Sequence, residues 1–244
     1  MEESGVISIH EVDVFQENHL VLQKVNLEVK KGDFFYIIGK TGSGKSSLLK
    51  TLYADLPLVS GEAEVVGYDL QKIKQKEIPF LRRKMGLVFQ EFQLLQDRNI
   101  EENLFFVMRA TGWKDKKEMK EKATEILGKV GLQNKGFKMP HQVSGGEQQR
   151  LGIARALIND PVLILADEPT GNLDPQSSEG IMELLFEISK NNCAVLMATH
   201  DYSLFEKYPA TTYVCEEGRL VKHGETVGEV TKGQSEEETE RRRD

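Results

Sequence analysis

The chain has 244 residues, of which 39% are hydrophobic and 29% charged, a composition that indicates a folded protein and excludes wholesale disorder. Its 32 basic and 39 acidic residues give a net charge of −7, so we expect no nucleic-acid partner. The acidic N-terminus has no apolar run, and the central apolar stretch 162–166 is far below the ~20 residues of a bilayer span. We therefore expect a cytoplasmic protein that reaches a membrane only through a partner.

The first part of the chain is predicted to contain mostly strands. Residues 6–12, 25–29 and 34–38 are apolar or alternating and rich in β-branched and aromatic side chains. Turn-forming residues separate these stretches. Residues 44–53 have the apolar spacing of a helix, and the apolar run 85–89 predicts another strand.

The rest of the chain alternates between the two patterns, which predicts a mainly parallel α/β sheet. The predicted elements are a helical stretch from about 99 to 130, a helix at 145–158, a strand at 162–166, a helix at 175–190 and a strand at 194–199. Asp115 and Glu118 have the spacing of a capping box. We expect residues 93–139 to form an inserted helical lobe and the charged residues 235–244 to be disordered.

One stretch matches the pattern G-x-x-x-x-G-K-[ST] between a predicted strand and a predicted helix: Gly39, Lys40, Thr41, Gly42, Ser43, Gly44, Lys45 and Ser46. Glycines let the loop, which we extend to Ser47, turn its backbone N–H groups toward phosphate oxygens. We expect Lys45 to reach the β- and γ-phosphates and Ser46 to bind Mg²⁺. A glycine-rich turn without function would match in roughly one per cent of chains this long. The stretch therefore predicts a nucleoside triphosphate site.

Polar side chains follow three of the predicted strands. Asp167 and Glu168 come after the strand at 162–166, His200 follows the strand at 194–199, and Gln90 follows the strand at 85–89. Ligands of open α/β sheets bind at the carboxyl ends of the strands. Asp167 suits Mg²⁺ and Glu168 suits a base that deprotonates the attacking water, with His200 near the γ-phosphate. Each alone would more often be structural, as a solvated turn, a structural histidine or an ordinary loop glutamine.

A second helix start also has the features of an anion site. Ser144 and Glu147 have capping-box spacing, which is the simpler explanation, but Gly145 and Gly146 leave backbone N–H groups uncovered. The chain thus has one phosphate loop and two phosphate-type helix starts. A two-fold dimer explains this count, because the second helix start of each copy would then close the nucleotide site of the other copy.

These motifs occur in the order found in ABC ATPases, and the resemblance spans roughly residues 6–224. It implies a P-loop NTPase fold with a mainly parallel core, an antiparallel N-terminal β subdomain and an inserted α-helical subdomain. It also implies that Phe15 stacks on adenine, that Gln90 touches Mg²⁺ and the membrane partner, and that the loop ending at Asp174 crosses the dimer seam. Val143 and Glu147 depart from the usual leucine and glutamine of the signature loop, without removing a phosphate contact.

The implied boundaries make residues 1–234 one ATPase domain. Its core comprises about 1–92 and 140–225, and the helical subdomain comprises about 93–139. Within the ABC ATPases the chain is similar to the FtsE group of cell-division ATPases, in the stretches 94–98, 144–150, 166–174 and 196–201.

The similarity to FtsE implies ATP and Mg²⁺ as ligands, a homodimer with ATP, and an integral-membrane FtsX-like subunit that activates peptidoglycan hydrolases. It places the chain at the cytoplasmic face of the inner membrane. Because the sequence Asn172-Leu173-Asp174 also occurs in ATPases of lipoprotein release and macrolide export, an exporter ATPase is the alternative.

Two further classes fit less well. An ABC ATPase of DNA repair or the ribosome would need coiled-coil arms or tandem ATPase domains, and a P-loop kinase would have no use for the signature loop.

For partner coupling we favour the segment 90–106, where Phe92, Leu94 and Leu95 line either a groove for the membrane subunit or the core of the helical lobe.

Overall fold

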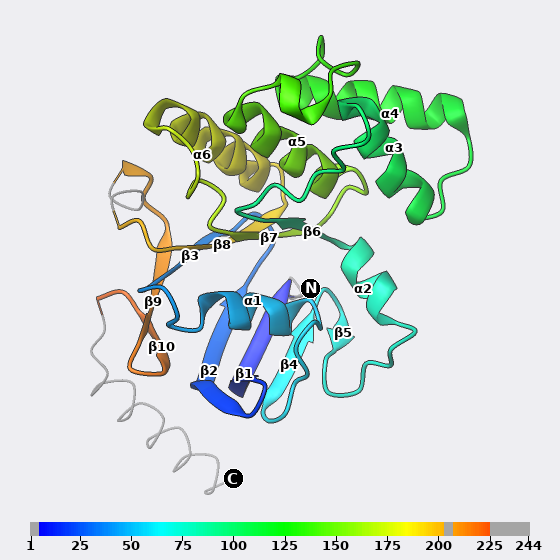
Figure 1. The fold of residues 1–244 in the computed structure, drawn as a ribbon. Coiled ribbons are helices and arrows are strands. Elements are labelled where there is room, and N and C mark those ends of the chain that lie inside the picture. Colours follow the sequence, from blue (N-terminus) through cyan, green and yellow to red (C-terminus); the bar gives the residue numbers. More distant parts are fainter. Residues whose placement is uncertain (1–4, 203–206, 225–244) are drawn as a thin grey trace, which may run out of the picture.

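The computed structural model describes residues 5–202 and 207–224, so the tail at 235–244 lies outside the described residues. Within these ranges the strands form two sheets (Figure 1). The antiparallel sheet has the order β2-β1-β4-β5, with β1 (Ile7–Gln16), β2 (His19–Val29), β4 (Glu62–Val65) and β5 (Tyr68–Asp69). The mainly parallel sheet has the order β10-β9-β3-β8-β7-β6, with β3 (Phe34–Ile38), β6 (Met85–Val88), β7 (Leu163–Asp167), β8 (Ala194–Thr199), β9 (Thr211–Glu216) and β10 (Arg219–Lys222). In the second sheet only the β9–β10 pair is antiparallel.

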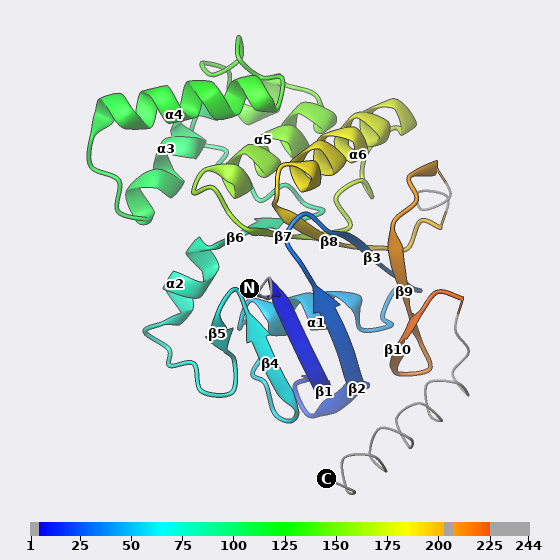
Figure 2. The ribbon, with the colours of Figure 1, turned by 180° about the vertical axis from the view of Figure 1, so that it is seen from behind.

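Helices cover both faces of the parallel sheet. Their bounds are α1 (Lys45–Leu52), α2 (Ile78–Arg83), α3 (Ile100–Ala110), α4 (Lys116–Lys129), the 3₁₀ turn η1 (Pro140–Gln142), α5 (Gly145–Leu157) and α6 (Pro175–Lys190). Helix α1 lies between the two sheets, α5 and α6 cover the opposite face, and α3 and α4 stack over α5 (Figures 1 and 2). No helix within the described ranges combines the length and apolar character needed to cross a bilayer.

Strand β3 shows how the sequence builds this layering. All five of its residues are buried, as expected for a central parallel strand. Because side chains alternate between the faces of a strand, Phe34, Tyr36 and Ile38 join the core under α5 and α6, whereas Phe35 and Ile37 join the core around α1. The predicted α/β class and the N-terminal antiparallel sheet are thus confirmed.

The predicted elements differ from the observed ones mainly in extent. The strands predicted at 6–12 and 25–29 are parts of one long hairpin, β1–β2, whose register is interrupted by bulges. The helical stretch predicted at 99–130 is two helices, because Thr111 and Gly112 (φ 102°) end α3, and Asp115 then caps α4 by accepting from the amides of Lys117 and Glu118. The sequence analysis made no prediction for β4, β5, α2, β9 or β10.

A buried asparagine holds the start of the helical layer. Asn103 on α3 is fully buried, and its Nδ2 donates to the carbonyls of Leu95 (3.1 Å), Arg98 (3.2 Å) and Asn99 (3.0 Å). Its Oδ1 accepts from the Leu95 amide at 2.9 Å. One side chain therefore satisfies four backbone groups of the loop that leads into α3.

Replacing Asn103 with alanine would leave two part-buried groups without a protein partner, the Leu95 amide and the Arg98 carbonyl, because the Leu95 and Asn99 carbonyls also accept from backbone amides. We expect Asn103→Ala to lower the free energy of unfolding by about 2–4 kcal/mol, since each unsatisfied buried group costs about 1–3 kcal/mol. Chemical denaturation measures the change. The matched control is Asn191→Ala, because the exposed Asn191 makes one bond to the Glu187 carbonyl. Equal effects of the two substitutions would contradict this account of the loop.

Candidate active site

The loop between β3 and α1 is shaped by two glycines. Gly44 has a φ of 103°, and a Cβ at this position would lie 2.7 Å from Val21 Cγ1, so a larger residue does not fit. At Gly39 a Cβ would lie 2.6 Å from Ser43 Oγ and 2.8 Å from the carbonyl oxygen of Cys215. Three residues of the loop are exposed to solvent: Lys40, Thr41 and Gly42.

Lys45, the first residue of α1, is a buried cation at the centre of the site. Only 5% of the residue is exposed, and its Nζ donates to the carbonyls of Gly39 (2.7 Å) and Lys40 (3.2 Å). The same Nζ lies 3.6 Å from Oε1 of Glu168. A buried ammonium needs anionic partners, and the loop that surrounds it provides mainly neutral carbonyls. The arrangement therefore suits a ligand with negatively charged oxygens.

Asp167 ends β7 beside the same loop. The Ser46 hydroxyl donates to its Oδ1 at 3.0 Å, which joins two predicted metal ligands that are 121 residues apart. Burial raises the pKa of the Asp167 carboxyl above its ordinary value, and the charge of Glu168 adds to the rise, while the Ser46 bond opposes it. A buried carboxylate whose charge is disfavoured would be stabilised by a cation.

These residues fit Mg²⁺ held partly by phosphate. Ser46, Asp167 and Gln90 line one cavity of about 700 Å³. Within the described residues no cluster of three or more His, Cys, Asp or Glu side chains could hold a metal alone. Magnesium usually keeps waters and binds through one or two carboxylates plus phosphate oxygens, which matches this donor set.

Glu168 is held in a strained backbone conformation. Its φ of 48° lies in the left-handed region, which costs a non-glycine residue about 1–3 kcal/mol. The His200 amide donates to Glu168 Oε2 at 3.3 Å, and His200 Nδ1 lies 2.9 Å from the same oxygen. Both residues line a second cavity of about 700 Å³, together with Thr170 and Leu173. These contacts hold the carboxylate between Lys45 and His200.

Gln90 follows β6 and is fixed by a reciprocal amide pair. Its side-chain Nε2 donates to Asn172 Oδ1 at 3.2 Å, and its backbone carbonyl accepts from Asn172 Nδ2 at 3.3 Å. The sequence analysis did not identify Gln149, a fully buried glutamine on α5. Its Nε2 donates to the carbonyls of Pro169 (2.7 Å) and Phe89 (3.3 Å). These bonds connect α5 to the loops that follow β7 and β6. A polar residue on the apolar face of a predicted helix is the signal that could have revealed it.

The start of α5 has the predicted capping box. Ser144 Oγ accepts from the Glu147 amide, and the Glu147 carboxylate accepts from the Ser144 amide. Lys135 pairs with Glu147 and holds the pKa of this carboxyl below its usual range. A Cβ on Gly146 would lie 2.7 Å from Ser177 Oγ, so this glycine is required for packing against α6, whereas a Cβ on Gly145 would make only ordinary contacts.

Not all predicted residues meet within one chain. Neither of the two cavities is lined by Ser144, Gly145, Gly146 or Glu147. Asp174 caps α6 by accepting from the Ser177 amide at 3.0 Å, and this bonding lowers the pKa of its carboxyl. Phe15 is half-buried on β1, and its neighbour Gln16 accepts from Ser47 Oγ at 3.3 Å, which places the end of β1 beside the phosphate loop.

Known proteins resemble the chain in sequence and in fold. The family model of ABC transporters matches residues 22–171. The cell division ATP-binding protein FtsE of Streptococcus pneumoniae is 39% identical over 218 residues, which are 89% of this chain and 94% of that protein.

Two solved structures of one protein, MJ0796, each cover 88% of this chain and 96% of that chain. The dimeric structure of this bacterial ABC transporter cassette has a TM-score of 0.77 at 32% identity. A dimeric post-hydrolysis state of it, bound to ADP and Pi, has a TM-score of 0.76 at 30% identity. The chain therefore belongs to the ABC transporter family as an ATP-hydrolysing cassette, within the group of FtsE cell division ATP-binding proteins.

Proposed function

We propose that two copies of the chain bind two Mg·ATP between them and that the closing and opening of this dimer moves an FtsX-like integral-membrane subunit. The observation that carries the proposal is the gathering of Lys45, Asp167 and Glu168 at one sheet edge, while the helix start at Ser144 lies outside both cavities of its own chain. The dimeric cassette of similar fold supports a pair of chains.

Each half of the site has its own task in binding. The loop from Gly39 to Ser47 and the Lys45 ammonium hold the phosphates, and Phe15 stacks on the base. Ser46, Asp167 and Gln90 would hold Mg²⁺, which would supply positive charge to offset that of the phosphates. From the partner copy, the helix start with Ser144, Gly145, Gly146 and Glu147 faces the phosphates, and Asp174 lies near the dimer seam.

Hydrolysis depends on Glu168. Its carboxylate accepts a proton from the attacking water, and His200, next to Oε2, holds that carboxylate and the water in place. In the closed dimer both chains bind the same γ-phosphate, each through its own loop. When the γ-phosphate is cleaved off, the two chains lose this shared anion. The dimer then opens, because the contacts that favoured the closed state are gone.

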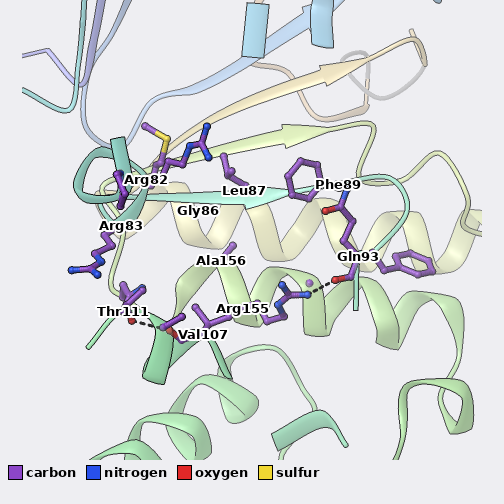
Figure 3. Close-up of a pocket in the computed structure, with 16 residues that line it drawn as sticks. Arg82, Arg83, Gly86, Leu87, Phe89, Gln93, Val107, Thr111, Arg155 and Ala156 are labelled. Carbon is purple, nitrogen blue, oxygen red and sulfur yellow. Dashed lines mark hydrogen bonds between the residues drawn. The ribbon is translucent and has the colours of Figure 1, made fainter. Parts of the chain in front are cut away.

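The membrane subunit docks at a pocket between the helical layer and the sheet. This pocket of about 350 Å³ has an apolar wall that includes Leu87, Phe92 and Val107, and two of its arginines are Arg83 and Arg155 (Figure 3). Arg155 Nη1 donates to the Gln93 carbonyl at 2.5 Å, while its buried Nε has no protein partner among the described residues. An apolar helix with an acidic side chain would match this lining.

The favoured segment 90–106 is divided between the pocket and the core. Phe92 lines the pocket, whereas Leu94 is buried in the core under the helical layer. We propose that the core subdomain (1–92 and 140–225) and the helical subdomain (93–139) form one ATPase domain. Through this domain, closing of the ATP-bound dimer moves the membrane subunit that is docked at the pocket.

In the cell this complex regulates peptidoglycan hydrolysis during division, from the cytoplasmic face of the inner membrane. The similarity to curated cell division proteins over most of the chain supports this role. The second candidate, an ATPase of a lipoprotein or macrolide exporter, rests on the shared sequence Asn172-Leu173-Asp174. Affinity purification from the native envelope decides between them, because the first requires an FtsX-like subunit and the second an exporter permease.

The role of Glu168 predicts that a variant without this carboxylate binds ATP but does not hydrolyse it. Glu168→Gln keeps the size of the side chain and removes the base, so we expect ATP hydrolysis to fall roughly 10²–10⁴-fold. ATP affinity should be retained, and the variant should accumulate as an ATP-bound dimer in size-exclusion chromatography. The exposed Glu121→Gln on α4, outside both cavities, is the matched control and should hydrolyse normally. Normal turnover by Glu168→Gln would mean that the base lies elsewhere.

Because the pKa of Asp167 is raised, replacing this carboxyl with a neutral group should increase the folding stability in a pH-dependent way. Because the folded pKa lies above the unfolded one, ionisation of Asp167 costs stability as the pH rises from about 4. Asp167→Asn avoids this cost, so without nucleotide it should melt at a higher temperature than the wild type at pH 7, and the difference should shrink toward pH 4. The exposed Asp97→Asn should show no such gain. A variant that is less stable at pH 7 would contradict the burial argument.

Docking at the pocket predicts a specific crosslink. Ala110 lines the pocket and is exposed, so Ala110→Cys places a thiol at its edge with little change in volume. In membranes that contain the co-expressed membrane subunit, a short bifunctional thiol–amine reagent should join the two proteins. Thr124→Cys, exposed on α4 and outside the pocket, should give far less product. Equal crosslinking at both sites would place the interface elsewhere.

A further inference from the structure

One segment of this acidic chain is strongly basic. Residues 72–84 contain six basic side chains and one acidic one, Glu77, although the whole chain carries −7. The segment leads from β5 through α2 at the outer edge of the molecule (Figures 1 and 2). We name as the basic patch its exposed or half-exposed cations together with one aromatic residue: Lys72, Lys74, Lys76, Phe80, Arg83 and Lys84.

The charges of the patch are less neutralised than those of the lysine-rich helix α4. On α4, Lys117, Lys120, Lys122 and Lys129 all pair with carboxylates. In the patch, Lys72 pairs with Asp69, but within the described residues no ion pair or hydrogen bond involves the ammonium of Lys74 or Lys76. The patch therefore presents a local positive field, which extends about one Debye length, ~8 Å at physiological salt.

Phe80 gives the patch an exposed apolar residue. The residue is 52% exposed, and the guanidinium of Arg83 lies 5.1 Å from the centre of its ring. Its neighbours anchor the helix: Leu81 is fully buried, and Arg82 donates to the carbonyls of Tyr53 and Ala54. The fold thus holds an aromatic ring outward among cations, the combination found in proteins that bind anionic interfaces.

The patch is continuous with the pocket assigned to the membrane subunit. Pro79, Arg82 and Arg83 line that pocket at one end, and Figure 3 shows Arg83 extending away from it. If the pocket holds a cytoplasmic segment of an integral-membrane protein, α2 lies on the side that faces the bilayer. This orientation rests on the proposed function, whereas the charge and exposure of the patch do not.

We propose that the basic patch binds the anionic phospholipid headgroups of the membrane surface, with Phe80 entering the headgroup layer. The contact holds the ATPase against the bilayer independently of its membrane subunit. It also limits how far α2 moves from the membrane while the dimer opens and closes.

Vesicle sedimentation tests the proposal with the purified full chain and no membrane subunit. The wild type should bind phosphatidylglycerol vesicles, lose binding in 0.5 M salt, and leave phosphatidylcholine vesicles unbound. Each basic residue near an anionic surface contributes about 1 kcal/mol, so Lys74→Gln/Lys76→Gln should weaken the partition roughly 30-fold. Phe80→Ser should also weaken it, without changing the salt dependence.

The matched control is Lys116→Gln/Lys117→Gln on α4, which removes the same charge from another exposed surface. It should keep vesicle binding within about twofold of the wild type, since charges beyond a Debye length contribute little. Absence of binding to phosphatidylglycerol, or an equal loss in the control, overturns the proposal. So does a Lys74/Lys76 variant that binds vesicles normally but no longer co-purifies with the membrane subunit. Because the vesicle assay needs neither ATP turnover nor that subunit, its result is separate from the Glu168 and crosslinking tests.

Discussion

The burial of one positive charge organises the active site. The Lys45 ammonium is held by the carbonyls of Gly39 and Lys40 and by the carboxylate of Glu168, at the edge where β3, β7 and β8 end. The two carbonyls belong to the loop after β3 and the carboxylate follows β7, so the parallel order of the strands is what brings them together. Since these partners are mostly neutral, the arrangement favours a polyanionic ligand over an empty site.

Much of this could be predicted from the sequence, because local chemistry determined it. The buried strands β3, β7 and β8 are continuous apolar runs, and Asp174 with Pro175 marks the start of α6 at the observed residue. Polar residues that follow such strands meet at one edge, and the Ser46 hydroxyl of the loop after β3 donates to Asp167 at the end of β7. The two-residue strand β5 and the six-residue helix α2 are too short to show a periodic pattern.

Other features depend on tertiary contacts whose partners a local pattern does not specify. Asn103 and Gln149 are both fully buried: Asn103 binds the backbone of the loop directly before its helix, and Gln149 binds the carbonyls of two loops distant in sequence. The glycines of the α5 start predict an anion site, and Gly146 is also needed for the close approach of Ser177. Phe92 lines the pocket and also packs against the core in which Leu94 is buried, an arrangement that depends on how the loop 90–99 packs.

The central claim is that a complete site takes one half from each of two chains, and complementation between inactive variants tests it most directly. Lys45→Ala removes the phosphate half, and Gly145→Asp places a negative charge at the signature half where the fold tolerates a side chain. Each variant alone should be inactive, while an equal mixture should recover roughly a quarter of wild-type ATPase activity, because half of the dimers carry one intact site of two. A mixture as inactive as its components would contradict the account.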